Sequence, residues 1–150
     1  LQQTKKLIAD GASLNARRDN GSTPLSTASL NGRLEIAKHL IQKGARVTQT
    51  NRDGNTPLHV AAFMCQTEIT KLFLEKGASV RKKNNRGESA IDVVSSPWNE
   101  GLEAFYRSLI SSSEIDLTIE QIKALRPQVL KLLRSKEAKS NLQAKAIERP

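Results

Sequence analysis

The sequence predicts an all-α solenoid in which short helix–turn–helix units stack side by side. Two landmarks recur along the chain with a step of 33 residues. One is a Gly-Ala pair, found at residues 11–12, 44–45 and 77–78. The other is a five-residue segment that reads GSTPL from Gly21, GNTPL from Gly54 and GESAI from Gly87. Two markers in one register indicate a structural repeat, and a unit of this size must stack on neighbours to cover its apolar face.

Each repeat should open with a short helix that has a capping residue at its N-terminus. Thr23 and Thr56 have side chains that cap helices, and each precedes a proline at the first helical position. Ser89 can cap the helix of the third unit. We therefore predict first helices over 24–31 and 57–64.

A second helix should follow in each repeat. Gly32 interrupts the chain, and apolar residues then recur at helical spacing, which predicts second helices over 34–43 and 67–76. Gly44 and Gly77 stand where a left-handed residue ends a helix. Side chains at repeated positions should then build the core: the row Leu25, Leu58 and Ile91, the turn layer Leu14, Val47 and Val80, and the small residues Ala28, Ala61 and Ala62.

Residues 1–98 resemble the ankyrin-repeat family. The family pattern of a Thr-Pro-Leu-His start, a helix pair and a Gly-Ala end is almost complete in the repeat that contains TPLHVAA at 56–62. The resemblance implies an ankyrin-repeat solenoid of L-shaped units with projecting finger loops. It also implies a function in protein–protein recognition.

The chain departs from the family pattern at particular positions. Ser26 and Asp92 stand where the middle repeat has His59, so the hydrogen bonds between repeats must differ there. Cys65 takes the position of Gly32, and a positive φ at that turn would cost about 1 kcal/mol of strain.

The repeat pattern reappears in the C-terminal third of the chain, after an interruption. Residues 129–138 align with 36–45 and 69–78, which predicts a second helix of the last repeat over 127–138, with Pro127 at its start. This alignment leaves an insertion of 27 residues, between about 98 and 125, with helices predicted near 99–111 and 118–125. The alternative is an appended helical cap over 99–138. In either case the segment should cover the end of the stack.

The predicted ankyrin-repeat domain therefore spans 1–138, and a basic tail spans 139–150. Its units cover about 1–18, 19–51, 52–84 and 85–138. Leu1 aligns with Leu34, so the first unit contains only its second helix. Either a further helix lies upstream of Leu1, or Leu7 and Ile8 are partly exposed.

Composition excludes several classes of function. Aromatic residues make up 3% of the chain, which argues against stacking platforms for single-stranded nucleic acid. The only histidines, His39 and His59, fit structural roles, and Cys65 has no evident base partner. The sequence holds no metal-ligand triplet, phosphate loop or nucleophile elbow, so we predict no enzyme activity, cofactor or metal. One cysteine and no apolar run of membrane-spanning length favour an intracellular protein.

Two surfaces are candidate binding sites. The fingers contain basic residues that could form a ridge for an acidic protein or peptide, although a charge run can also be a plain solvated surface. On the concave face, Leu30 and Asn31 align with Phe63 and Met64, and an exposed Phe-Met pair would make an apolar anchor. The alternative is that Phe63 packs on a neighbouring repeat or on the insertion. The finger residues are Arg17, Arg18, Arg52, Arg81, Lys82, Lys83 and Arg86.

The leading hypothesis is therefore a monomeric module that binds another protein. A net charge of +9 keeps nucleic-acid binding open as an alternative. A further alternative is a structural arm of a larger enzyme whose catalytic part lies outside this chain. The basic residues of the C-terminal part are Lys123, Arg126, Lys131, Arg134, Lys136, Lys139, Lys145 and Arg149.

Overall fold

The computed structural model describes residues 2–3, 6, 12–112 and 114–147, and the last three of these by their backbone only. Seven helices with defined bounds lie in this part of the chain, which contains no strand. The predicted all-α ankyrin-repeat solenoid is thereby confirmed. Part of the first unit, including Leu7, Ile8 and Gly11, lies outside the described residues. The helices are α2 (Pro24–Leu30), α3 (Leu34–Gln42), α4 (Pro57–Phe63), α5 (Thr67–Glu75), α6 (Ala90–Ser95), α7 (Glu100–Ser111) and α8 (Ile119–Ile147).

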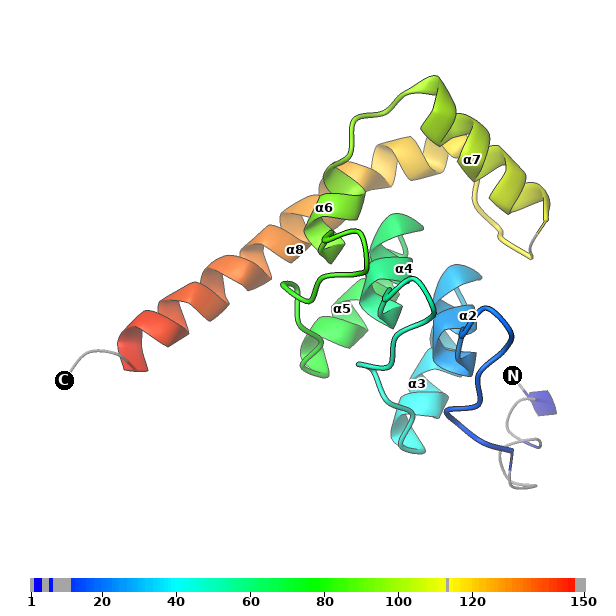
Figure 1. The fold of residues 1–150 in the computed structure, drawn as a ribbon, viewed down its shortest axis with the longest axis horizontal. Coiled ribbons are helices and arrows are strands. Elements are labelled where there is room, and N and C mark those ends of the chain that lie inside the picture. The colour runs from blue at the N-terminus through cyan, green and yellow to red at the C-terminus, as the bar shows by residue number, and fades with distance from the viewer. Residues whose placement is uncertain (1, 4–5, 7–11, 113, 148–150) are drawn as a thin grey trace.

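The helices of the stack form two layers (Figure 1). The first helices of the repeats, α2, α4 and α6, pack side by side in one layer. The second helices, α3 and α5, form the other layer, and α8 continues it beyond α5. Finger loops precede α2, α4 and α6, and α7 lies across the opposite ends of the first helices.

Local sequence determines where the first helices begin, as predicted. The Thr23 hydroxyl accepts a hydrogen bond from the backbone N–H of Ser26. Thr56 with His59, and Ser89 with Asp92, form capping boxes in which each side chain bonds the other residue's backbone N–H. These caps satisfy N–H groups that have no partner within a helix.

The turns also follow the predictions. Gly44 and Gly77 end their helices with φ angles of 99° and 82°, in the left-handed region that favours glycine. Cys65 repeats the conformation of Gly32, with φ of 54° against 65°, and no other described non-glycine residue has a positive φ. The repeat therefore imposes a strained backbone on Cys65.

The core follows the repeated positions. Leu40 of α3, Phe73 of α5 and Leu133 of α8 are buried at corresponding places of the second layer. Leu25 and Leu58 are also buried, whereas Ile91 is half-buried because α6 is the last helix of the first layer. Val80 is buried, and Leu14 and Val47 of the turn layer are half-buried.

α8 corrects one prediction. In place of separate helices over 118–125 and 127–138, a single helix runs from Ile119 to Ile147 with Pro127 in its interior. Ile122, Val129 and Leu133 lie on one face and are buried in the core, so packing of a continuous helix outweighs the local cost of proline. The helix also continues into the predicted tail.

The length of α8 reflects a departure from the repeat pattern. Glu137 aligns with Gly44 and Gly77, so the glycine that ends the other second helices is absent here. The division of the chain into units, with an inserted or appended segment, stays a prediction. None of the described helices combines the length and apolar character needed to cross a membrane.

Candidate partner-binding surface

The finger loops are built from asparagine turns that join into one row. The Asn51 Oδ1 atom accepts hydrogen bonds from the N–H groups of Asp53 and Asn55, at 3.0 and 2.9 Å. Asn84 makes the same pair of bonds 33 residues later, to Arg86 and Glu88. Asparagine folds turns in this way because its short side chain reaches the backbone ahead of it.

Backbone hydrogen bonds connect one finger to the next. The N–H of Arg52 donates to the carbonyl of Asn20 at 3.2 Å, and the N–H of Asn85 donates to the carbonyl of Asp53 at 2.9 Å. These bonds repeat in register, so the three fingers have a fixed spacing. The row therefore presents its side chains on a rigid support.

The predicted basic residues of the fingers are all exposed, but they do not form a single ridge. Arg17 and Lys83 occupy equivalent positions with Thr50 between them, whereas Arg18 corresponds to Asn51 and Asn84. The seven cations are consequently spread over the finger row.

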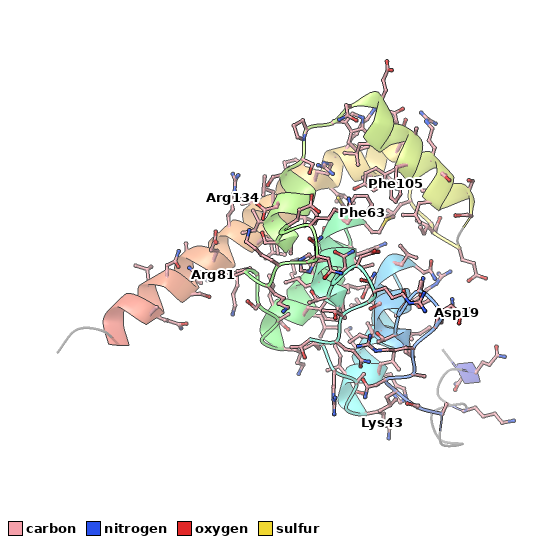
Figure 2. All side chains as sticks on the ribbon, viewed as in Figure 1. Asp19, Lys43, Phe63, Arg81, Phe105 and Arg134 are labelled. Atoms are coloured by element: carbon pink, nitrogen blue, oxygen red, sulfur yellow. The ribbon has the colours of Figure 1, made fainter. Side chains whose placement is uncertain are left out.

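Carboxylates lie near two of these cations. The Arg81 Nε atom is 4.0 Å from Glu137, and the Lys83 Nζ atom is 3.8 Å from Asp92. Figure 2 shows Arg81 projecting beside α8. Arg17, Arg52 and Lys82 take part in none of the ion pairs found among the described residues. Arg18 and Arg86 take part in none of them either, and these two line the groove described next.

A groove of about 810 Å³ lies between the finger row and α7. Its floor is formed by one face of α2, α4 and α6, and its polar wall by the inner sides of the fingers. α7 and the loop after it form the second wall. The floor includes Leu30, Asn31, His59, Val60, Phe63 and Val93.

α7 directs an apolar stripe into this groove. Asn99 caps the helix by accepting a hydrogen bond from the N–H of Leu102. Leu102, Phe105 and Leu109 follow at helical spacing and line the groove. The sequence predicts this helix, but nothing local shows that these three side chains face the concave side of the stack.

Four of the five aromatic residues of the chain gather where α7 meets α4. The rings of Trp98, Tyr106 and Phe63 stack in sequence, with centroids 5.5 and 4.5 Å apart. Phe105 meets the edge of Phe63 at 5.7 Å, and Figure 2 shows these two side chains facing each other. Phe63 is half-buried, so it packs on the α7 segment, which was the alternative to an exposed anchor.

Met64 does not lie on the binding surface. It is fully buried, with none of its surface exposed, so the prediction that Met64 is part of an exposed anchor is wrong. The flexible methionine side chain fills the core at the end of α4. Leu30 and Asn31, at the equivalent place of the preceding repeat, are half-buried and line the groove.

Polar contacts fasten the α7 segment to α8. The Glu103 carboxylate accepts hydrogen bonds from Lys123 of α8, from Arg107 and from the indole N–H of Trp98. These donors lower the pKa of Glu103 to about 2. Arg33 also donates to the carbonyl of Glu114, which ties the loop after α7 to the turn between α2 and α3.

The titratable groups His59, at the groove, and Cys65, in the core, have structural roles. The N–H of Thr56 donates to His59 Nδ1, so Nε2 carries the proton and donates to the carbonyl of Glu88 in the next finger, at 3.0 Å. Burial lowers the pKa of His59, and burial raises the pKa of the Cys65 thiol to about 12. A protonated, buried thiol is a poor nucleophile. The described residues contain no cluster of His, Cys, Asp or Glu that could hold a metal ion.

A family model described as ankyrin repeats (3 copies) matches residues 1–84, which is more than half of the chain. No curated protein matches the chain.

Proposed function

The chain belongs to the ankyrin-repeat family, and from this premise we propose that it binds an acidic protein through its basic fingers and the adjoining groove. Ankyrin repeats generally mediate protein–protein interaction and are generally non-enzymatic. The observation that supports the proposal is a rigid row of fingers whose exposed cations flank a groove of about 810 Å³. Surface cations of this kind increase the rate of association with an acidic surface more than they increase the affinity of the complex.

The finger cations provide the test. The variant Arg17→Glu/Arg52→Glu/Lys82→Glu reverses three exposed charges that belong to no ion pair among the described residues. A matched variant, Lys131→Glu/Arg134→Glu/Lys139→Glu, reverses the same number of exposed charges on α8. Partners captured by the wild-type protein and identified by mass spectrometry should be lost from the finger variant and kept by the α8 variant. Equal capture by all three proteins would contradict a role for the fingers.

Nucleic-acid binding is a second candidate, and one feature of α8 favours it. Lys131, Arg134 and Lys139 are exposed along this helix, and none belongs to an ion pair within the described residues. A mobility-shift assay with duplex and single-stranded DNA over a series of salt concentrations tests it. Binding through phosphates weakens linearly on a log–log salt plot and should disappear in the α8 variant. The absence of a shift at low salt would remove this candidate.

We further propose that the protein is a monomer and that it performs no catalysis. Light scattering coupled to size-exclusion chromatography, at a protein concentration well above that of the binding assays, measures the oligomeric state directly. A dimer would change the interpretation of every affinity measured with immobilised protein.

A further inference from the structure

We propose that α8 binds an acidic amphipathic helix of a partner protein along one face of its C-terminal half. The residues of this face, called the α8 seam, are Leu132, Ser135, Lys139 and Leu142. The seam belongs to the layer of second helices, whereas the finger surface proposed above adjoins the first helices. It is therefore an additional interface, and its partner is a different protein from the one that the fingers bind.

A groove of about 180 Å³, the α5–α8 groove, lies between α5 and the C-terminal half of α8. Three seam residues, Leu132, Ser135 and Lys139, line its α8 side. On the α5 side lie the buried Leu74 and Glu75, the last residue of α5. α8 continues past this point because it lacks the glycine that follows α5. One wall of the groove therefore ends, while the other continues as a free helix.

The free part of α8 carries an exposed apolar side chain. Leu142 is 69% exposed, more than any other large apolar side chain among the described residues. Figure 1 shows the last turns of α8 standing clear of the stack. Steps of three, four and three residues lead from Leu132 to Leu142, so the seam residues share one face of the helix. Leu142 therefore extends the line of the groove beyond the end of α5.

The spacing of the seam favours a helix as its occupant. Alternating steps of three and four residues are the pattern by which one helix packs along another. An extended segment would need partners for its backbone N–H and C=O groups, and a helix has none to offer because its own groups are bonded internally. The seam is about 15 Å long, which corresponds to about three turns of a partner helix.

Charge defines the chemistry of this partner helix. The lining of the α5–α8 groove includes three lysines and one carboxylate: Lys71, Lys136, Lys139 and Glu75. Lys71 pairs with Glu68, whereas Lys136 and Lys139 belong to none of the ion pairs found among the described residues. A lysine within a helix–helix seam needs an opposite charge once water is removed. The partner helix should therefore place a carboxylate opposite Lys139, between its own apolar residues.

The experiment uses a display library of helix-forming peptides with one randomised face, selected on the full chain. Enriched peptides are labelled, and their affinities are measured by fluorescence polarisation at low and high salt. We expect apolar residues at helical spacing with a carboxylate between them, and an affinity that falls at high salt without being lost. Enrichment of lysine-rich or uncharged helices would overturn the inference.

A first pair of variants tests the apolar contact. Leu142→Asp removes it and should weaken binding at least about tenfold. Ala144→Asp adds the same charge two residues later, at an exposed position on another face of the helix, and should weaken binding less than about twofold. Both positions are exposed, so neither substitution should unfold the protein.

A second pair of variants tests the charge. Lys139→Glu reverses a seam charge and should weaken binding about three- to tenfold at low salt, and less at high salt. Arg134→Glu reverses an exposed charge of α8 that does not line the α5–α8 groove, and should change the affinity less than about twofold. Equal losses in the two variants would mean that net charge, rather than the seam, attracts the peptide, and would overturn the inference.

The outcomes separate the seam from the other two proposals. The finger variant Arg17→Glu/Arg52→Glu/Lys82→Glu should bind the enriched peptides as tightly as wild type. Loss of binding in this variant would assign the peptides to the fingers, which would overturn the seam and support the finger function. A selection without any enriched peptide would overturn the seam and leave the finger function standing. Duplex DNA that binds α8 in that case would assign its cations to nucleic acid.

Discussion

The hydroxyl group of Tyr106 on α7 donates a hydrogen bond to the carbonyl oxygen of Phe63, the last residue of α4, at 2.5 Å. The same hydroxyl accepts a hydrogen bond from the buried Arg126 of α8, whose other terminal nitrogen donates to the carbonyl of Ser96. Three elements far apart in the sequence are thereby joined at one place. This cluster holds the α7 wall over the groove.

The first prediction concerns this attachment. Tyr106→Phe keeps the ring stack but leaves the Phe63 carbonyl and Arg126 with one partner fewer, and should cost about 1–2 kcal/mol of stability. Chemical denaturation measures the loss, and trypsin should cleave α7 faster at Arg107 once its attachment weakens. Ser108→Ala, at an exposed position of the same helix, is the control. Unchanged stability in Tyr106→Phe would show that stacking alone holds α7 in place.

The second prediction concerns the strained turn at Cys65. Glycine usually destabilises a protein relative to alanine by about 0.5–1 kcal/mol, because it has more freedom in the unfolded chain. At a φ of 54° this order of stability should reverse, because the left-handed backbone strains every residue with a Cβ atom. Cys65→Gly should therefore be more stable than Cys65→Ala. Urea denaturation of the two variants gives the comparison. A more stable alanine variant would mean that the turn stores no strain.

The third prediction concerns the end of the second layer. Glu137→Gly restores the glycine that ends α3 and α5, and should unwind α8 beyond that position. Far-UV circular dichroism should report a loss of helix, and amide exchange should place it in residues 138–147. Glu137→Ala also removes the carboxylate near Arg81 but favours helix, so its spectrum should match that of wild type. An intact helix in the glycine variant would refute this explanation of its length.

The fourth prediction concerns pH. Burial lowers the pKa of His59 below its usual 6.5, so the unfolded chain binds more protons than the folded one as pH falls through this value. The stability that depends on neutral His59 should therefore be fully present above about pH 6.5. It should decrease below this pH, until the folded-state pKa is reached. Denaturation about one unit above and below this pH measures the slope.

His39→Gln should keep this slope, because His59 is still present. His59→Gln should lower stability at both pH values, since the bond to the Glu88 carbonyl is altered, and should flatten the slope. If stability depends on pH equally in both variants, groups other than His59 cause this dependence.

The sequence predicts those features that depend on neighbouring residues. Thr23, Thr56 and Ser89 cap their helices because a cap needs only a side chain and the N–H groups that follow it. The positive φ of Cys65 follows from its place in the repeat, where Gly32 has the same conformation. These interactions are local, so a repeated pattern is enough to reveal them.

The sequence fails where contacts distant along the chain decide the outcome. Pro127 marks a helix start by local rules, yet it lies inside α8 because residues on both sides of it pack into one core. Met64 and Phe63 share a predicted surface, but one is buried and the other stacks on Tyr106. The position of Phe63 cannot be derived from spacing, because the α7 segment on which it packs comes more than 30 residues later.

By itself, the sequence determined that 33-residue units stack, where α2 to α6 begin, and that basic fingers project from the stack. Only the tertiary structure decided that α7 turns back over the first helices and converts a concave face into a two-walled groove. The physical reason is the range of the interactions. Caps and turns are satisfied within a few residues, whereas the position of α7 depends on side chains such as Tyr106 and Arg126 that find their partners far along the chain.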